Sequence, residues 1–448
     1  MTAKPRNRAL SPEELDAFAA ELDALRARTV ATIGQADADY IRAVYAAVRY
    51  FGFAGRALLM LAAIAGAFYP PVLWVAGTLG VLSLALSKIL ENMELGHNVI
   101  HGQFDWMNDP ALNGRTYEWD IAGTSDNWRK THNFRHHTWT NVRGLDDDIG
   151  YGLLRLFPEQ RWRPFYLAQP VVAVVFAILF EWGIAIQDLR LGRWFAGKKT
   201  TRELREEFRP VGRKMARQVL KDYVFFPLLA GPFFLTVLVG NAIANVLRNL
   251  WTYLIIFCGH FTADAETFAR DSVRDEGRGG WYIRQLRGSS NIAGGRLLNL
   301  MSGNLSHQIE HHFFPDVPAN RYAAMAVEVR EICARYGQHY NTGSLPRQFG
   351  QAANGGPVAG QGSFRGALAP GRAEGVSPAA VRTAGVRCGS SHARCAGLRT
   401  SRRHAPGLPR SGARCRRVRR SVRRCSIPPW PWACPNSCRP GPAASSRR

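Results

Sequence analysis

The feature that most constrains the fold is a nearly uninterrupted apolar stretch from Ala57 to about Leu90, in which Lys88 is the only charged residue. A helix that spans a membrane needs about 20 apolar residues, and Pro70 and Pro71 interrupt the stretch near its middle. We therefore predict two antiparallel membrane spans that turn at the prolines. The alternative, a pair of buried helices in a soluble protein, is disfavoured by so long a stretch with a single charge.

Eight of the twelve histidines are concentrated in three groups, and each group lies close to an apolar stretch. The groups are His97 and His101; His132, His136 and His137; and His307, His311 and His312. Residues four apart share one face of a helix, with Cβ atoms about 5–6 Å apart, so a pair at this spacing can hold one metal ion. The extra adjacent histidine in the second and third groups points about 100° further round the helix and lets one group reach two metals.

The number and type of these side chains restrict the metal. A single zinc ion takes about four ligands, so eight imidazoles suit two metals better than one. Imidazole-rich ligation, with no cysteine or carboxylate set at ligand spacing, favours iron, copper, nickel or zinc. Oxygen chemistry on an apolar substrate would select iron among these. We therefore predict that the three groups converge on two iron ions at a membrane surface.

Further residues are candidates for the same site. His260 ends the last apolar stretch and is a ninth possible ligand, with an ordinary interfacial histidine as the alternative. Metal-bound histidines need an acceptor for their other ring nitrogen. The candidates for this role are Glu94, Asp146, Asp147, Asp148, Asn304 and Glu310. The alternative interpretation of each is a solvated surface group.

Two later apolar stretches complete the predicted topology. Residues 223–258 are interrupted by polar residues and are predicted to form two more spans, with a turn near Gly240 and Asn241. An even number of crossings must separate the second and third histidine groups if they share one site. Residues 165–187 are therefore predicted to be an interfacial or re-entrant helix. The segment 188–221, with eleven Lys and Arg residues, supports this because short basic loops stay on the cytoplasmic side.

These observations predict an all-α integral membrane protein with about four transmembrane helices, an interfacial helix and a cytoplasmic helical cap that holds the metals. Residues 1–50 are predicted to be an N-terminal cytoplasmic segment, without a signal peptide, whose amphipathic helix begins at Ser11 and Pro12. Residues 51–350 form the predicted membrane domain.

Residues 351–448 differ in composition from the rest of the chain. Nineteen arginines and one acid, Glu374, lie from Ala352 onward, so this tail carries +18 of the net charge of +24. The high charge therefore does not predict nucleic-acid binding. We predict a disordered tail rich in Arg, Pro, Gly and Cys, either natural or read out of frame. Six of the eight cysteines lie in this tail, so no disulfide framework is predicted for the membrane domain.

The residues around the three histidine groups resemble the three histidine boxes of membrane fatty acid desaturases. The matching stretches are Gly96–Gln103, His136–Asn141, Gln308–His312 and His311–Asp316. The likeness is greatest to actinobacterial stearoyl-CoA 9-desaturases and covers roughly residues 10–350. It implies a four-span fold and a nine-histidine di-iron site that includes His260. It also implies insertion of a cis double bond into a long-chain acyl-CoA or acyl-lipid, with O2 and two external electrons.

One position departs from the family pattern. Animal stearoyl-CoA desaturases have an asparagine four residues before the histidine that corresponds to His260, and Ile256 stands there in this chain. Asn304 is our candidate for its substitute. Some relatives carry a fused cytochrome b5 domain with a His-Pro-Gly-Gly motif, which is absent here. A separate ferredoxin or flavin reductase is therefore expected as electron donor, docking on the basic cytoplasmic face.

Other functions remain open from the sequence. A fatty acyl hydroxylase on the same scaffold would use the same irons and yield an alcohol instead of an alkene. A zinc-dependent membrane hydrolase or receptor would bind one zinc and no iron. An inactive paralogue is the third alternative, although all eight box histidines are present.

Overall fold

The computed structural model describes residues 7–157 and 159–353. The predicted tail from residue 354 onward therefore lies outside the described residues. Residues 351–353, which their composition assigns to that tail, instead end the helix α17 Leu345–Ala353.

The first helix, α1 Pro12–Val30, begins where the sequence predicts. The Ser11 hydroxyl accepts a hydrogen bond from the Glu14 backbone N–H, and the Glu14 carboxylate accepts one from the Ser11 N–H, so the two residues form a capping box. Phe18 and Leu22 are fully buried and pack in one core cluster with the helices α13 and α16. This helix therefore shares a hydrophobic core with the C-terminal helices.

Two long antiparallel helices follow, as predicted. They are α2 Gln35–Ile64 and α3 Pro70–Leu90, and Pro70 opens the second one. Their backbones approach closely at Gly55, where an added Cβ would lie 2.6 Å from the Leu84 nitrogen. The helix α2 begins well before the apolar stretch, because its early residues Ile41 and Val44 pack in a core cluster with the first histidine box.

The turn predicted near Gly240 and Asn241 is wrong. A single helix, α12 Phe234–His260, runs through both residues. The preceding antiparallel arm consists of α10 Thr201–Val219, η6 Leu220–Phe225, α11 Phe226–Leu229 and η7 Gly231–Phe233, so the chain turns at Gly231, whose φ is +55°. Two asparagines in this helix instead bind Asp222 of the neighbouring arm. Asn241 donates to the Asp222 carbonyl at 2.7 Å, and Asn245 donates to its carboxylate at 3.3 Å.

The segment predicted to be interfacial or re-entrant forms two helices, α7 Gln169–Ile178 and α8 Phe180–Gln187, which meet at an angle of 100°. Among the described residues, three helices are long and apolar enough to cross a membrane: Gln35–Ile64, Pro70–Ile100 and Gly231–His260. The number becomes four if the bent pair is one span. The four-span count therefore stays a prediction.

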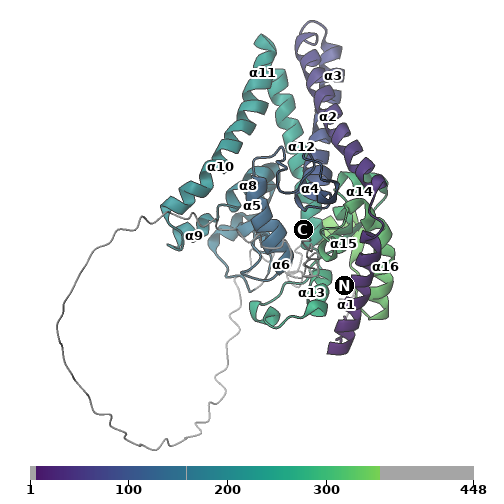
Figure 1. Ribbon diagram of the computed structural model, residues 1–448. Coiled ribbons are helices and arrows are strands. Elements are labelled where there is room, and N and C mark those ends of the chain that lie inside the picture. Colours follow the sequence, from purple (N-terminus) through teal and green to yellow (C-terminus); the bar gives the residue numbers. More distant parts are fainter. Residues whose placement is uncertain (1–6, 158, 354–448) are drawn as a thin grey trace, which may run out of the picture. The chain divides into compact units, whose positions relative to one another are not determined.

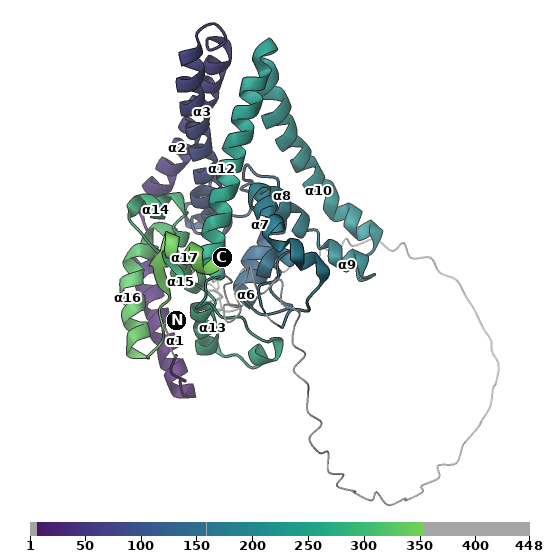
Figure 2. The same cartoon turned by 180° about the vertical axis from the view of Figure 1, so that it is seen from behind.

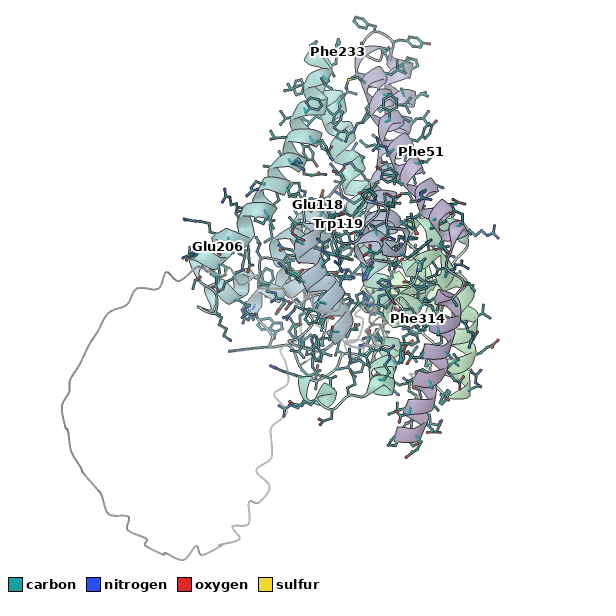
Figure 3. All side chains as sticks on the ribbon, in the orientation of Figure 1. Phe51, Glu118, Trp119, Glu206, Phe233 and Phe314 are labelled. Carbon is teal, nitrogen blue, oxygen red and sulfur yellow. The ribbon has the colours of Figure 1, made fainter. Side chains whose placement is uncertain are left out.

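The long helices project to one side, opposite α1 and α13, in both views (Figures 1 and 2). They carry many exposed apolar side chains, including Phe53, Trp74 and Leu228, while the labelled Phe314 lies lower, among the shorter elements (Figure 3). Such a surface suits the interior of a lipid bilayer, which agrees with a membrane protein.

The remaining elements are short and form the part that holds the histidines. In chain order the first are η1 Glu91–Gly96, α4 His97–Ile100, η2 Asp105–Met107, α5 Ser125–Trp128, η3 Arg129–His136, α6 His137–Trp139, η4 Ile149–Gly152, η5 Pro164–Ala168 and α9 Leu191–Phe195. After α12 come η8 Arg270–Val273, α13 Arg278–Arg287, β1 Asn291–Ala293, α14 Arg296–Met301, η9 Leu305–His307, α15 Gln308–Phe313, η10 Ala319–Arg321, α16 Tyr322–Arg335 and β2 Thr342–Ser344. The strands β1 and β2 pair in parallel, with Asn291 opposite Thr342.

Candidate metal centre

The first two histidine groups lie in stretches of unusual helix winding. η1 and η3 are both π-helical, and they lead into α4 and α6. π-Helical turns are rare in proteins, but where they occur they are often part of a functional site. The predicted i, i+4 pairs do share a face, since the ring centroids of His97 and His101 lie 4.8 Å apart, as do those of His132 and His136.

Four imidazoles from the three histidine boxes come together in space. The ligand nitrogens of His97, His101, His132 and His311 all lie within 4.8 Å of one another. Nε2 of His97 and Nε2 of His311 are 3.3 Å apart. We call these four residues the four-imidazole group.

A second group consists of His136, His260 and His312, whose ligand nitrogens meet the same 4.8 Å limit. Nε2 of His312 and Nε2 of His260 are 3.2 Å apart. The side-chain amide of Gln308 reaches this three-imidazole group, with Nε2 at 2.9 Å from the His260 Nε2. His137 lies between the two groups, stacked on His312 at 4.5 Å and 4.7 Å from His311 between ring centroids.

The chemistry of these donors fits two transition-metal ions. Burial and neighbouring histidines lower the pKa of His311 and of His312 well below the ordinary value, so both rings are neutral and offer lone pairs. The buried Nε2 atoms of His132 and His136 have no hydrogen-bond partner among the described residues. Neutral imidazole nitrogens that face one point are stabilised by a bound cation.

Two carboxylates hold the histidines of the second box. Nδ1 of His136 lies 3.0 Å from the Asp146 carboxylate, and Nδ1 of His132 lies 3.2 Å from that of Asp148. Burial lowers the pKa of His136, but the charges of the two aspartates outweigh it and raise that pKa overall. Such acceptors fix the ring orientation and make the other nitrogen a stronger ligand.

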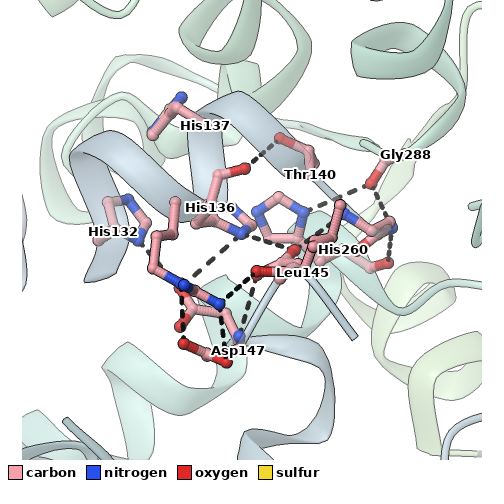
Figure 4. A network of polar contacts seen from close by, with 12 residues as sticks. His132, His136, His137, Thr140, Leu145, Asp147, His260 and Gly288 are labelled. Carbon is pink, nitrogen blue, oxygen red and sulfur yellow. Dashed lines mark hydrogen bonds and ion pairs between the residues drawn. The ribbon is translucent and has the colours of Figure 1, made fainter. Parts of the chain in front are cut away.

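Neutral groups hold three further rings, those of His260, His311 and His312, at Nδ1. Nδ1 of His312 lies 2.9 Å from the Gln285 side-chain oxygen, and Nδ1 of His311 lies 3.4 Å from the Tyr322 hydroxyl. Nδ1 of His260 lies 3.4 Å from the Gly288 carbonyl oxygen, in the network of Figure 4. The sequence analysis did not single out Gln285 or Tyr322, because it considered only carboxylates and Asn304 as acceptors, and Gln285 lies 27 residues before His312.

The four other candidates for this supporting role, Glu94, Asn304, Asp147 and Glu310, contact different partners. The Glu94 carboxylate accepts hydrogen bonds from Asn304 at 2.9 Å and from Asn98. The role of Asn304 as substitute for the missing asparagine at position 256 stays a prediction.

Asp147 and Glu310 form ion pairs and hydrogen bonds with residues near the site. Asp147 forms ion pairs with Arg135 and Arg190 and belongs to the network of Figure 4. Glu310 accepts from Tyr340 at 2.8 Å, and its closest histidine contact is Nδ1 of His307 at 3.9 Å.

Two box histidines, His137 and His307, belong to neither group. His137 packs against members of both, whereas His307 does not line up with His311 as predicted. The 3-10 helix η9 ends at His307, and α15 begins at the next residue, so residues 307 and 311 do not lie on one continuous α-helix. The i, i+4 argument assumed such a helix. Gln308 occupies the place beside the histidines instead, as its contact with His260 shows.

A narrow cavity of about 60 Å³ adjoins both histidine groups. Its walls near the histidines are largely aromatic and aliphatic: Trp119, Trp128, Tyr151, Phe180, Ile184, Ile256 and Phe261. Trp128 stacks on His132 with the ring centroids 4.3 Å apart. We call this space the chamber. It contacts the candidate metal ligands, and its lining also includes charged residues such as Glu181 and Arg248.

The chain is similar to known desaturases. The model of the fatty acid desaturase family matches residues 72–344. The NADPH-dependent stearoyl-CoA 9-desaturase of Mycobacterium tuberculosis is 45% identical over 76% of this chain and 79% of its own length. The sn-1 linoleoyl-lipid 6-desaturase of Synechocystis is 27% identical over 63% of this chain and 80% of its own, and fatty acid desaturase 3 of Bos taurus is 25% identical over 60% and 58%.

Proposed function

Because this chain belongs to the fatty acid desaturase family and desaturates acyl chains, we propose that its substrate is a long-chain acyl-CoA, with stearoyl-CoA and the 9 position as the first expectation. The name of the relative from Mycobacterium tuberculosis supports both points. The relatives do not favour the hydroxylase or the zinc-dependent hydrolase and receptor that the sequence left open.

The two imidazole groups support the metal assignment. We propose that the four-imidazole group holds one iron ion, and that the three-imidazole group, with Gln308 beside it, holds the second. His137 lies between them and can serve either ion. A bound pair of irons supplies the activation of O2 and the removal of hydrogen from an unactivated CH2 group. The observation that carries this proposal is the inward convergence of imidazole nitrogens whose outer nitrogens are held by Asp146, Asp148 and neutral acceptors.

The surrounding residues hold the substrate and exclude water. The aromatic chamber removes an acyl chain from solvent and fixes its position beside the histidines. Such fixed positioning lowers the activation barrier, because the entropy cost of bringing the reacting groups together has already been met on binding. Trp128, stacked on His132, restricts that chain on the side of the four-imidazole group. No protein acid or base needs to contact the carbon that reacts.

The electron donor and the orientation in the membrane are also proposals. We propose a separate ferredoxin or flavin reductase, which the words NADPH-dependent in the relative's name support. The basic helix α10, with six Lys and Arg residues against three Glu, supports a cytoplasmic position for the docking surface and for the active site. Membrane lipids surround the projecting helices.

The test is expression in a host that lacks its own acyl desaturase, followed by mass-spectrometric location of new double bonds. New cis-9 alkenes in C18 chains are expected, together with two irons per chain in the purified protein. A hydroxylated product, or one zinc and no iron, would contradict the proposal. The variant His339→Ala, which alters a histidine outside both groups, serves as the control for nonspecific effects of histidine substitution.

A further inference from the structure

The chamber has a second end, and its chemistry differs from that of the end beside the histidines. Along α12 its wall runs from His260 through Ile256 and Thr252 to Arg248. Twelve residues separate the first and last of these, a rise of roughly 18 Å at 1.5 Å per residue. The lining residues on α12 thus extend over a length on the scale of an acyl segment.

A buried ion pair lies at this second end. Arg248 and Glu181, from α12 and α8, form a salt bridge with only 1% and 2% of their side chains exposed. The Ala122 N–H donates to the second Glu181 oxygen at 3.2 Å. Both residues line the chamber. Charges at membrane depth are costly unless paired, and they usually have a function.

Several polar atoms around the pair have no protein partner. Among the described residues, Nε and Nη1 of Arg248 and the side-chain oxygens of Asn92 and Asn249 are buried and make no hydrogen bond. All three residues line the chamber. Buried polar groups in this state are satisfied by water. A methyl group that displaced such water would leave the polar groups unpaired, which is unfavourable.

The end wall is also fixed in position. Nδ2 of Asn249 donates to the Ile178 carbonyl at 2.8 Å, at the bend between α7 and α8. This bond ties α12 to the bend, while the Arg248–Glu181 pair ties it to α8, whose Phe180 and Ile184 line the chamber.

We propose that the Arg248–Glu181 pair is the closed end of the acyl chamber, where it stops the methyl end of the substrate and sets the longest acyl chain that the enzyme accepts. This inference rests on the proposed function as an acyl-CoA desaturase. The methyl-terminal part of the chain lies between the histidines and Thr252, and the charged end excludes further methylene groups.

The test removes both charges together, since removal of one would leave the other buried and unpaired. In Arg248→Met with Glu181→Leu, the end becomes apolar. Acyl-CoA thioesters of increasing chain length are titrated against purified protein, with the shift of the thermal unfolding midpoint as the measure of binding, and the products are analysed in parallel. Each methylene that gains apolar surroundings adds about fourfold in affinity, so the chain two carbons beyond the wild-type limit should bind roughly fifteenfold more tightly than to wild type.

A second variant acts in the opposite direction and does not depend on the folding of the first. Thr252→Leu adds bulk one turn before the end, so the longest accepted chain should become shorter. The matched control is Arg321→Met with Asp37→Leu, which removes a pair whose carboxylate is also fully buried but which does not line the chamber. Its length limit should equal that of wild type.

The outcomes separate this inference from the proposed function. If wild type neither binds nor desaturates acyl-CoA of any length, the proposed function fails and this inference fails with it. If wild type desaturates acyl-CoA but a folded form of either chamber variant keeps the wild-type limit, the chamber does not end at Arg248 and Glu181. The same conclusion follows if the control shifts the limit equally.

Discussion

Nε2 of His97 and Nε2 of His311 lie 3.3 Å apart, although 214 residues separate them in the chain. His97 follows the π-helical end of α3, and His311 lies on α15 beyond the last long helix. Their contact closes the four-imidazole group and makes the site depend on the packing of the first membrane helices against the C-terminal part of the domain.

This contact predicts unequal roles for two histidines of the third box. His311→Ala should reduce bound iron from two per chain to about one and should lower desaturation at least ~100-fold, because it removes a ligand. His307→Ala should keep both irons, since His307 lies outside both groups. Metal analysis of the purified variants measures the difference. Equal loss of iron in the two variants would refute the ligand assignment.

Two adjacent aspartates provide a second comparison. Asp146→Asn weakens the acceptor of His136 and should lower metal affinity or activity by about 10–100-fold. Asp147→Asn removes only partly exposed ion pairs with Arg135 and Arg190 and should cost about 0–1 kcal/mol of stability with little loss of iron. Iron retention during dialysis against a weak chelator distinguishes them. Greater iron loss from the Asp147 variant would contradict the geometry.

Gln308 should matter for the three-imidazole group because its amide lies 2.9 Å from Nε2 of His260. Gln308→Ala should lower occupancy of one iron site, whereas Gln308→His, which restores a nitrogen ligand near the same place, should retain two irons per chain. Mössbauer spectra of protein loaded with ⁵⁷Fe report the two sites separately. If Gln308→Ala leaves both sites unchanged, the side chain has no role in metal binding.

Metal removal should destabilise the folded protein. A ligand that binds only the folded state, present at a thousand times its dissociation constant, stabilises that state by about 4 kcal/mol, so chelation should lower the thermal unfolding midpoint on the order of 10 °C. The shift should be smaller in His311→Ala, which holds one metal fewer. If chelator leaves the thermal unfolding midpoint of the wild-type protein unchanged, the protein holds no stabilising metal.

Gly303 is expected to be required for the position of the first histidine box. Its φ is +69°, and a Cβ there would lie 2.2 Å from the Met93 carbonyl oxygen in η1. Gly303→Ala should therefore destabilise the protein by at least about 1–3 kcal/mol and weaken iron retention at the four-imidazole group. Gly144→Ala is the matched control, because Gly144 has a φ of +77° but no atom within 4 Å of an added Cβ. It should cost stability without loss of iron. Denaturation curves and metal analysis together test both variants, and equal iron loss would contradict the clash.

Some features of the site followed directly from residue spacing. Histidines four apart lie on one face of a helical turn whichever tertiary structure surrounds them, so the pairing of His97 with His101 and of His132 with His136 was predictable. The same reasoning failed at His307, because it requires a continuous helix and the chain changes winding between His307 and Gln308.

Polar residues within apolar stretches could not be interpreted locally. Asn241 was expected beside a turn, yet it lies inside α12, where it and Asn245 bind Asp222 from the neighbouring arm. A polar residue in such a stretch satisfies either a turn or a buried charge, and only the location of the charge decides between them. Gly231, with a positive φ, is the true turn residue.

By itself, the sequence determined that the chain forms apolar membrane helices and that its histidines occur in pairs able to bind metal, because hydropathy and helical periodicity are local properties. The tertiary structure alone decided which imidazoles share a group, that Gln285 and Tyr322 hold two of them, and that Arg248 meets Glu181 at the end of the chamber. These contacts join residues far apart in the chain, and their partners are selected by the packing of whole helices.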